Sequence, residues 1–512
     1  MRDKKWLIVF VLIILTITIA SILNINHTKD TISTISNSIE VDDGDLSIDW
    51  SRFPTTNIEL DESIELTKSG TYHLTGSLYD GSISIKGKQD TEVKLVLDNV
   101  TIINPTGPAI LCYSANNLVI ELVGENTITD GNTYSSDYDE NTKSTIYSKA
   151  DLTFEGEGTL NLTGYYSDGI ATNDDLKFKS GTYTISAKDD AMRGKDSVYI
   201  KDGTFTINAT ADAIKSTNET DYNKGFVLIE DGNFNITAGA KGLKATKSIL
   251  INNGNYVIIT TDDAIHSDGY LGISDGIINI SSGDDGIHAN KKLEIKNGNI
   301  HVIKSYEGLE AQVVAISGGE ISINAFDDGI NAGGGNDQSS LNKPTPGTFD
   351  EDANCIVSIN GGNIYINTAG DGIDSNGWLY FNGGKTIIDG PTTDNNGALD
   401  SGLGTITNGG EVIAIGSSGM ATNLGESSAV NNISVYLGQT YPSNTSIEVR
   451  DAAGNTLISH LSAKTFNHIA IASKDFTLGT TYHLFLNNEE YKSFTISNVT
   501  TTIGNDFRPP RK

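Results

Sequence analysis

The segment SSGDDGIHANKKLEIKNGNIHV, residues 281–302, holds one complete copy of a pattern that recurs along most of the chain. Two acids, Asp284 and Asp285, precede a small residue, Gly286, and an apolar residue, Ile287. The apolar residue serves as a marker, and its equivalents are Ile170, Met192, Ile214, Leu243, Ile265, Ile287, Leu309, Ile330, Ile373 and Leu399. The commonest step between markers is 22 residues, as from 170 to 192 and from 265 to 287. The chain is therefore built largely from a repeat of this length.

A second marker, the glycine that opens a short apolar segment in each repeat, supports the same period. Its members are Gly181, Gly203, Gly232, Gly254, Gly276, Gly298, Gly319, Gly362, Gly384 and Gly410. Both markers take their longest steps at the same places, so residues 216–224 and 333–352 are loops inserted into a fixed unit. Each unit holds three short alternating segments separated by turn residues. A hairpin meander gives no reason for the same residue to return to the same corner, whereas a parallel β-helix does. We expect an all-β, right-handed parallel β-helix, because parallel crossovers are overwhelmingly right-handed.

An aromatic and aliphatic column repeats with the same period. Its aromatic members are Tyr183, Phe205, Phe234 and Tyr256. Alternation within each segment directs these side chains inward, so we interpret them as an interior stack and not as a platform for sugars.

The two ends of the chain depart from the repeat. Basic residues and the apolar run that follows indicate a signal or anchor segment over residues 1–23, with cleavage left open, and residues 24–48 resemble a polar spacer. Residues 49–424 form the expected β-helix, residues 425–500 alternate like a small antiparallel β module, and residues 501–512 are a tail. Export and attachment to the cell envelope would place the protein at the cell surface or outside the cell.

Composition restricts the function classes. The formal net charge of −30 argues against a nucleic-acid partner, because no net basic surface is available to displace counterions from phosphates. The only two cysteines, Cys112 and Cys355, are 243 positions apart in the sequence, and we expect no disulfide between them.

The chain resembles exported carbohydrate-binding β-helix proteins of Gram-positive bacteria, which look like polysaccharide lyases and bind cellulose and polygalacturonate with calcium. Coverage extends from about Ile58 to Ser497. The resemblance is carried by the segments SGTYHLTGSL, VKLVLDNVTI, IYSKADLTFEGEGTLNL, DAMRGKDSVYIKDGTFTINA and NGALDSGLGTITNGGEVIAIGSSGMA, and by the DDGI-type turns. It implies polysaccharide binding and gives no secure precedent for catalysis. Lys241 departs from the pattern, because the turns otherwise carry Asp or Glu there, and this puts a cation site at that coil in doubt.

An acidic column precedes the markers by two positions. Carboxylates stacked about 4.8 Å apart repel by roughly 1 kcal/mol per pair in water and about 3.5 kcal/mol at an effective dielectric of 20. Calcium is a fitting counterion, although each Asp could equally cap its own turn. The candidate metal ligands are Asp168, Asp189, Asp190, Asp212, Asp262, Asp263, Asp284, Asp285, Glu307, Glu310, Asp327, Asp328, Asp371, Asp374 and Asp400.

Two further columns flank the marker. The small residue just before it, Gly or Ala in every coil, indicates either crowding against the next coil or a flat track open to a ligand. The residue just after it changes from basic to acidic along the chain, which favours an acidic polysaccharide beside bound calcium. His266 and His288 are neighbours in this column, but two ligands alone are too few for zinc. The candidate ligand-binding residues are Arg193, Lys215, Lys244, His266, His288 and Tyr199.

Three functions remain open. The first is a non-catalytic, calcium-dependent binder of pectin-like polygalacturonate and of cellulose. The second is a polysaccharide lyase, in which calcium acidifies a uronate and Arg193, Lys215 or Lys244 removes the proton. The third is a structural or adhesive wall protein in which the repeat is only a stiff rod.

Overall fold

This computed structural model describes residues 39, 41, 44–136, 138, 142–333 and 351–505. The expected signal or anchor segment, most of the spacer and the end of the tail lie outside the described residues. Among the residues that are described, no helix is both long and apolar enough to cross a bilayer. The unit treated below begins at Gly44 and opens with two 3-10 turns, η1 (Asp45–Ser47) and η2 (Trp50–Arg52).

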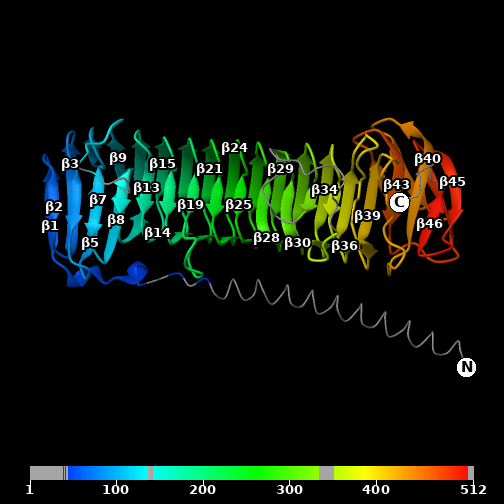
Figure 1. Ribbon diagram of the computed structural model, residues 1–512, viewed down its shortest axis with the longest axis horizontal. Coiled ribbons are helices and arrows are strands. Elements are labelled where there is room, and N and C mark those ends of the chain that lie inside the picture. Colours follow the sequence, from blue (N-terminus) through cyan, green and yellow to red (C-terminus); the bar gives the residue numbers. More distant parts are fainter. Residues whose placement is uncertain are drawn as a thin grey trace, which may run out of the picture. The chain divides into compact units, whose positions relative to one another are not determined.

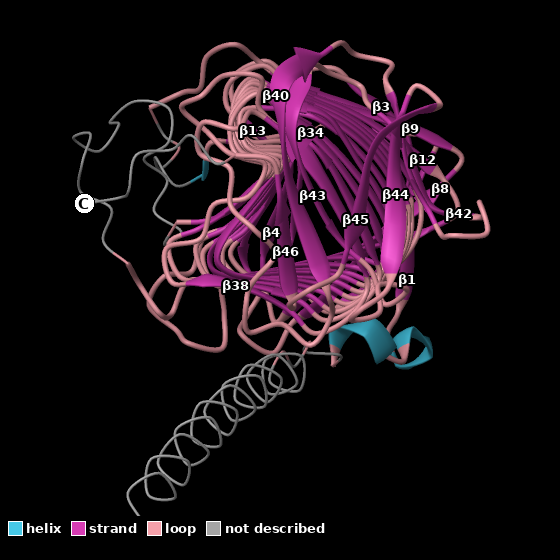
Figure 2. Cartoon of the chain, turned by 90° about the vertical axis from the view of Figure 1, so that its right-hand side faces the viewer, coloured by secondary structure: helices cyan, strands magenta, loops and turns pink. Residues whose placement is uncertain are grey.

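The repeats wind into a parallel β-helix with three strand faces, which confirms the predicted all-β fold (Figures 1 and 2). Face 1 carries the markers and consists of β2 (Ile64–Leu66), β4 (Ile83–Lys86), β7 (Ile110–Ser114), β10 (Ser144–Ser148), β13 (Asp168–Thr172), β16 (Met192–Gly194), β19 (Ile214–Ser216), β22 (Leu243–Ala245), β25 (Ile265–Ser267), the first parts of β28 (Ile287–Ile295) and β30 (Leu309–Ile316), β32 (Ile330–Ala332) and β35 (Ile373–Ser375).

Face 2 continues each coil. It consists of β1 (Thr55–Leu60), β3 (Gly70–Leu78), β5 (Glu92–Asp98), β8 (Asn117–Val123), β11 (Asp151–Gly156), β14 (Asp175–Phe178), β17 (Ser197–Ile200), β20 (Phe226–Ile229), β23 (Ser248–Ile251), β26 (Tyr270–Ile273), the second parts of β28 and β30, β33 (Ile356–Ile359), β36 (Trp378–Phe381) and β38 (Gly404–Thr407).

Face 3 completes the coil. It consists of β6 (Thr101–Asn104), β9 (Glu125–Asp130), β12 (Thr159–Gly164), β15 (Thr182–Ala187), β18 (Thr204–Ala209), β21 (Asn233–Ala238), β24 (Asn255–Thr260), β27 (Ile277–Ser281), β29 (Asn299–Ser305), β31 (Glu320–Ala325), β34 (Asn363–Thr368), β37 (Lys385–Asp389) and β39 (Glu411–Gly416).

The markers pair directly from coil to coil, as the 22-residue period predicts. Ile265 is the register partner of both Leu243 and Ile287, and Ile330 pairs with Ile373 across the second inserted loop. An isolated bridge from Ile373 to Leu399 extends the column by one coil. Stacked coils therefore place equivalent side chains above one another, which is the condition for any site built from a column.

The aromatic column is interior. Tyr183, Phe205, Phe234 and Tyr256 are buried, and their successive ring centroids lie 4.9, 5.0 and 4.7 Å apart. The glycine two residues earlier opens the strand with a positive φ, 118° at Gly181, a conformation that disfavours any side chain. The interpretation of these rings as a core stack is confirmed.

The small residue before each marker lies against the next coil. A Cβ on Gly308 would lie 2.3 Å from the Gly329 carbonyl oxygen, and one on Gly242 would lie 2.6 Å from the Ala264 carbonyl oxygen. Ala191, Ala213 and Ala264 in the same column are fully buried. Crowding, and not an open track for a ligand, explains the small residues.

The C-terminal part ends the solenoid and adds antiparallel pairing. Its strands are β40 (Asn432–Tyr441), β41 (Ser446–Arg450), β42 (Thr456–Leu461), β43 (Phe466–Ala472), β44 (Thr481–Leu486), β45 (Glu489–Thr495) and β46 (Thr500–Ile503). β43 pairs antiparallel with the last coil strand, β39, and with β40, and β42-β41-β44-β45 form a separate antiparallel sheet. The last strand, β46, pairs parallel with β40 and extends past residue 500, so the ordered module reaches into the expected tail. Both cysteines are buried and free, as expected.

Candidate functional site

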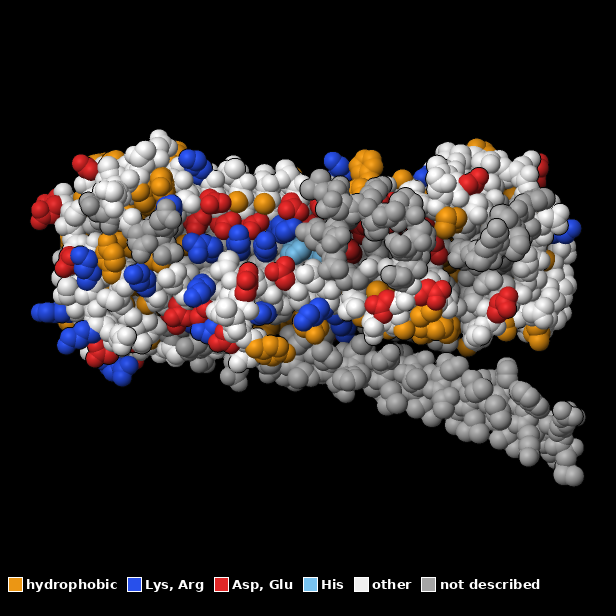
Figure 3. Space-filling view, in the orientation of Figure 1, with side chains coloured by type: hydrophobic (Ala, Val, Ile, Leu, Met, Phe, Trp, Pro, Cys, Tyr) orange, Lys and Arg blue, Asp and Glu red, His pale blue; other side chains and the backbone are white. Residues whose placement is uncertain are grey.

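The carboxylate column, defined as the residue two positions before each marker, lies at the corner where face 3 turns into face 1. The residue after each marker, here called the flanking column, lies beside it on face 1. In Figure 3, one side of the molecule carries basic side chains next to acidic ones over the middle coils, beside histidine. The two columns determine what this corner can bind.

One oxygen of the carboxylate column caps the next coil. Asp263 Oδ1 accepts a hydrogen bond from the backbone N–H of Asp285 at 2.9 Å, and Asp328 Oδ1 accepts one from Asp371 at 2.7 Å. The same bond recurs from the N–H of Asp212 to Asp190, of Lys241 to Asp212 and of Gly397 to Asp371. In these five carboxylates one oxygen therefore has a structural role, and the other oxygen is left to bind a cation.

In the N-terminal coils the other oxygen binds a cation of the protein. Arg193 donates through Nε and Nη2 to Asp168 Oδ2 at 2.9 and 2.7 Å. The Lys215 ammonium lies 3.2 Å from Asp190 Oδ2 and 2.8 Å from Asp212 Oδ2. These buried carboxylates are neutralised internally, and a metal is not required beside them.

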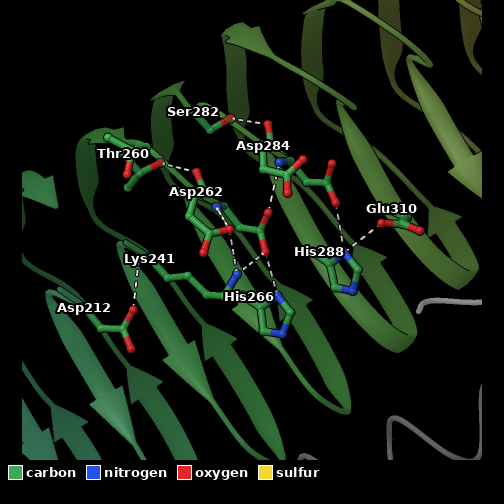
Figure 4. A network of polar contacts seen from close by, with 12 residues as sticks. Asp212, Lys241, Thr260, Asp262, His266, Ser282, Asp284, His288 and Glu310 are labelled. Atoms are coloured by element: carbon green, nitrogen blue, oxygen red, sulfur yellow. Dashed lines mark hydrogen bonds and ion pairs between the residues drawn. The ribbon is translucent and has the colours of Figure 1, made fainter. Parts of the chain in front are cut away.

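Lys241 occupies the carboxylate column itself and acts as a built-in counterion. Its Nζ lies 2.8 Å from Asp262 Oδ1 and 2.7 Å from Asp263 Oδ2 (Figure 4). Burial acts to raise the pKa of Asp263, but the hydrogen bond from His266 and the charge of Lys241 outweigh it and hold that pKa below its ordinary value. The ammonium lies between these acids and supplies positive charge to both of them.

The two histidines stack with ring centroids 4.6 Å apart, but their partners differ. His266 lies between two acids, with Nδ1 2.7 Å from Asp263 and Nε2 2.9 Å from Asp268. His288 Nδ1 lies 3.0 Å from Asp285 Oδ2 and 2.8 Å from Glu310 Oε2. Burial lowers the pKa of His288, but the hydrogen bonds and charges of these two carboxylates raise it to about 11.

In the C-terminal coils acids outnumber cations. Asp328, Asp371 and Asp374 bring carboxylate oxygens within 4.8 Å of one another. Within the described part of the chain, no lysine, arginine or histidine forms an ion pair with these three. Loss of water contact and then the neighbouring carboxylates raise the pKa of Asp371 to about 8 and that of Asp374 to about 7, and raise the pKa of Asp328 as well. This cluster lacks the counterions that the N-terminal coils contain.

Other candidate ligands have local roles. Asp189 is exposed and accepts a hydrogen bond from Ser167, and Asp327 accepts one from the Tyr306 hydroxyl. Asp400 accepts from the N–H of Ser401, and Glu307 accepts from the Asn331 amide. Asp284 is buried beside Asp262 and Asp263.

Three expectations about ligand-binding residues require correction. Tyr199 is only 5% exposed, packed in register between Lys177 and Leu228, so it does not offer a ring at the surface. His266 and His288 were also expected to face outward, and both are buried, His266 between Asp263 and Asp268 and His288 against Asp285 and Glu310. Lys244 remains partly exposed on the flanking column.

Several partners were not anticipated from the sequence. They are Asn290, whose amide oxygen lies 2.8 Å from His288 Nε2, Asp268 beside His266, and Asn331 beside Glu307. The first two stand two positions after their histidines, which is the only signal that the sequence offered. In an alternating strand, residues two apart lie on one face.

Comparisons with known proteins identify the family of the chain. The family model described as carbohydrate-binding domain-containing protein matches residues 60–308 and 256–395. A protein of that description from Acetivibrio thermocellus is 34% identical over 131 residues, which are 25% of this chain and 46% of the relative, so less than half of the relative's length is matched.

Among solved structures, the polysaccharide lyase-like protein from C. thermocellum, a gadolinium derivative, shares 27% identity and a TM-score of 0.40, covering 47% of this chain and 96% of that chain. The two family-model matches together span residues 60–395, most of the solenoid and nearly all of the carboxylate column. The chain therefore belongs to the family of carbohydrate-binding domain-containing proteins.

Proposed function

We propose that this protein is an extracellular, non-catalytic binder of acidic, pectin-like polysaccharide such as polygalacturonate, with calcium as the bridging ion and cellulose as a further ligand. The observation that carries the proposal is the unequal charge along one corner of the solenoid. Carboxylates lack counterions at Asp328, Asp371 and Asp374, while basic side chains line the flanking column at Arg193, Lys215 and Lys244.

The C-terminal acids fit calcium. Calcium takes six to eight oxygen ligands in flexible geometry, and carboxylates are its commonest protein donors. Asp328, Asp371 and Asp374 offer such oxygens close together and partly exposed, and they would hold the ion. A bound calcium would supply positive charge that a uronate carboxylate can share.

The basic stretch supports an anionic ligand. Among the described residues, Lys244 forms no ion pair, although its charge helps to lower the pKa of Asp268. A partly exposed ammonium beside a column of paired charges can attract carboxylates of a polyuronate chain running along the solenoid.

The lyase alternative needs a basic group that can accept a proton. Burial lowers the pKa of Lys215, but the carboxylates of Asp190 and Asp212 raise it above its ordinary value, so this ammonium stays protonated. Arg193 is held by Asp168 and cannot act as a base at neutral pH. These contacts favour binding over catalysis.

Binding and calcium dependence can be tested together. We expect the protein to sediment with insoluble polygalacturonate in calcium and to remain in solution in a chelator, with no absorbance from unsaturated uronates. Asp371→Asn combined with Asp374→Asn should weaken calcium-dependent binding at least about tenfold, since each ligand carboxylate is normally needed for affinity.

Asp189→Asn is the matched control, because this exposed acid belongs to the same corner and should leave binding unchanged. Equal binding in calcium and chelator would contradict the calcium proposal. Accumulation of unsaturated uronates would favour the lyase, and failure to bind either polygalacturonate or cellulose would favour a purely structural role.

A further inference from the structure

His288 lies at the junction between the neutralised and the acidic coils, and its surroundings differ from those of every other residue of the flanking column that the structure describes. Its Nδ1 faces Asp285 Oδ2 at 3.0 Å and Glu310 Oε2 at 2.8 Å (Figure 4). The three donor atoms come from two successive coils, Asp285 and His288 from the turn before β28 and its start, and Glu310 from the start of β30. All three side chains are buried.

The other ring nitrogen fixes the tautomer that a neutral His288 would adopt. Nε2 lies 2.8 Å from the amide oxygen of Asn290, which can only accept a hydrogen bond. Nε2 therefore carries a hydrogen, and the lone pair of Nδ1 in the neutral ring points at two carboxylates. Protons or a metal ion must lie between these three atoms, because otherwise a lone pair and two negative charges would face one another in a buried space.

Protonation of Nδ1 balances only part of the negative charge, because it gives the ring one positive charge opposite two carboxylates. The N–H formed can donate a good hydrogen bond to only one of those carboxylates. Asp285, which is fully buried, also has a second oxygen, Oδ1, without a hydrogen-bond partner. Buried carboxylate oxygens without partners are uncommon in folded proteins, and a missing ion is one explanation for them.

We propose that Asp285, His288 and Glu310 bind one divalent transition-metal ion of the zinc type. A divalent ion balances the two carboxylates, and an imidazole nitrogen favours zinc, cobalt or nickel over calcium, which prefers oxygen. Zinc bonds of about 2.1 Å at tetrahedral angles place donor atoms about 3.4 Å apart, so the donors need to separate by only a few tenths of an ångström. Asn290 orients the ring from the second ring nitrogen, as partners of metal-bound histidines do.

His266 provides an internal contrast one coil earlier. Both of its ring nitrogens lie against carboxylates, Asp263 and Asp268, and Lys241 also binds Asp263. A doubly protonated His266 satisfies these contacts completely. The site at His288 does not depend on glycan binding and lies apart from the Asp328, Asp371 and Asp374 cluster in the sequence of coils.

The test is metal binding by protein unfolded in a chelator and refolded with Zn²⁺ or Co²⁺, so that slow entry into a buried site is not mistaken for absence. We expect one zinc per chain by elemental analysis, and visible absorption from the cobalt form. His288→Gln should lower zinc affinity at least about 100-fold, and Asn290→Ala should lower it about 10–100-fold. His266→Gln should retain the metal.

The proposal is overturned if the refolded protein binds neither ion, if His288→Gln binds zinc as tightly as the parent protein, or if equimolar calcium displaces the zinc. The β-sheet circular dichroism of each variant reports folding. If His288→Gln does not fold, Asn290→Ala is the deciding variant, because it leaves all three donor side chains in place. A tenfold or larger loss of its zinc affinity supports the site, and an unchanged zinc affinity overturns it.

Discussion

The two halves of the carboxylate column have the same backbone and different electrostatics. From Asp168 to Asp263, arginine, lysine and histidine side chains bind the free oxygens of the acids. From Glu307 to Asp374, the neighbouring side chains are Glu, Asn and Asp. The comparison teaches that the repeat determines where a carboxylate lies, whereas the identity of a single neighbour decides whether that carboxylate forms an ion pair within the protein.

The strongest test of this comparison removes the internal counterion. Lys241→Met should destabilise the protein by about 3–5 kcal/mol, because it leaves the fully buried Asp263 and its neighbour Asp262 without the ammonium that they share. Urea unfolding measures the loss. Lys244→Met, in the same coil, should cost less than about 1 kcal/mol. Similar losses for the two variants would show that Lys241 is not a counterion.

A pair of glycine substitutions tests whether the coils pack against one another equally closely in the two halves of the carboxylate column. Gly242→Ala and Gly308→Ala place a Cβ within 2.6 and 2.3 Å of carbonyl oxygens of the next coil. Each should destabilise by about 1–3 kcal/mol. Gly272→Ala is the control, because its Cβ would meet only the flexible end of Leu250. A large difference between the first two in thermal unfolding would mean that the halves pack differently.

The acidic half should respond to pH in the opposite way from an ordinary salt bridge. Asp371 and Asp374 have pKa values raised to about 8 and about 7 in the folded state, above the ordinary value of 3.8. Between about pH 4 and pH 8 the folded state binds more protons than the unfolded state, so stability in a chelator should fall as pH rises through this window.

Calcium should reduce that fall, since it replaces the protons. Thermal unfolding between pH 5 and pH 8, with calcium or with chelator, measures the effect. The double variant Asp371→Asn and Asp374→Asn should show a flatter profile. A metal-free protein whose stability rises from pH 5 to pH 8 would contradict the expected neutral state of these carboxyl groups.

The smallest expected effect is on polysaccharide binding by the basic part of the flanking column. Lys244→Ala should weaken polygalacturonate binding only about two- to fivefold, and less at high salt, because a partly exposed charge contributes little. Lys201→Ala, an exposed lysine outside both columns, should leave binding unchanged. Indistinguishable affinities of these two variants at low salt would remove the flanking column from the binding surface.

The sequence predicted the architecture well because the period is a direct consequence of coil stacking. The marker pairs, the interior rings and the crowded glycines all follow from which residues recur at 22-residue intervals. The second role of each acid did not follow, since it depends on the distance from one coil to the next. Asp263 bonds a backbone N–H 22 positions later and a lysine 22 positions earlier.

Individual environments were the least predictable part. Alternation directs Tyr199 outward, yet neighbours in the adjacent coils bury it, and pattern analysis does not register such coverage. The contacts of His288 with Asp285 and Glu310 could not be predicted from the sequence either, because Glu310 has the same place in the pattern as Lys215 and Arg193. The sequence repeat predicts which residues form a column, whereas the contacts between two columns can be known only from the three-dimensional structure.

The bond from a carboxylate to the N–H of the following coil has an evolutionary consequence. Where consecutive coils carry it, as from Asp190 through Asp212 to Lys241, the middle coil both supplies a donor to its predecessor and offers an acceptor to its successor, so a duplicated or deleted unit leaves this bond intact at the new junction. Genes encoding such a chain can gain or lose whole units by unequal recombination while the product still folds. The lengths of the basic and acidic tracts can then change independently of each other.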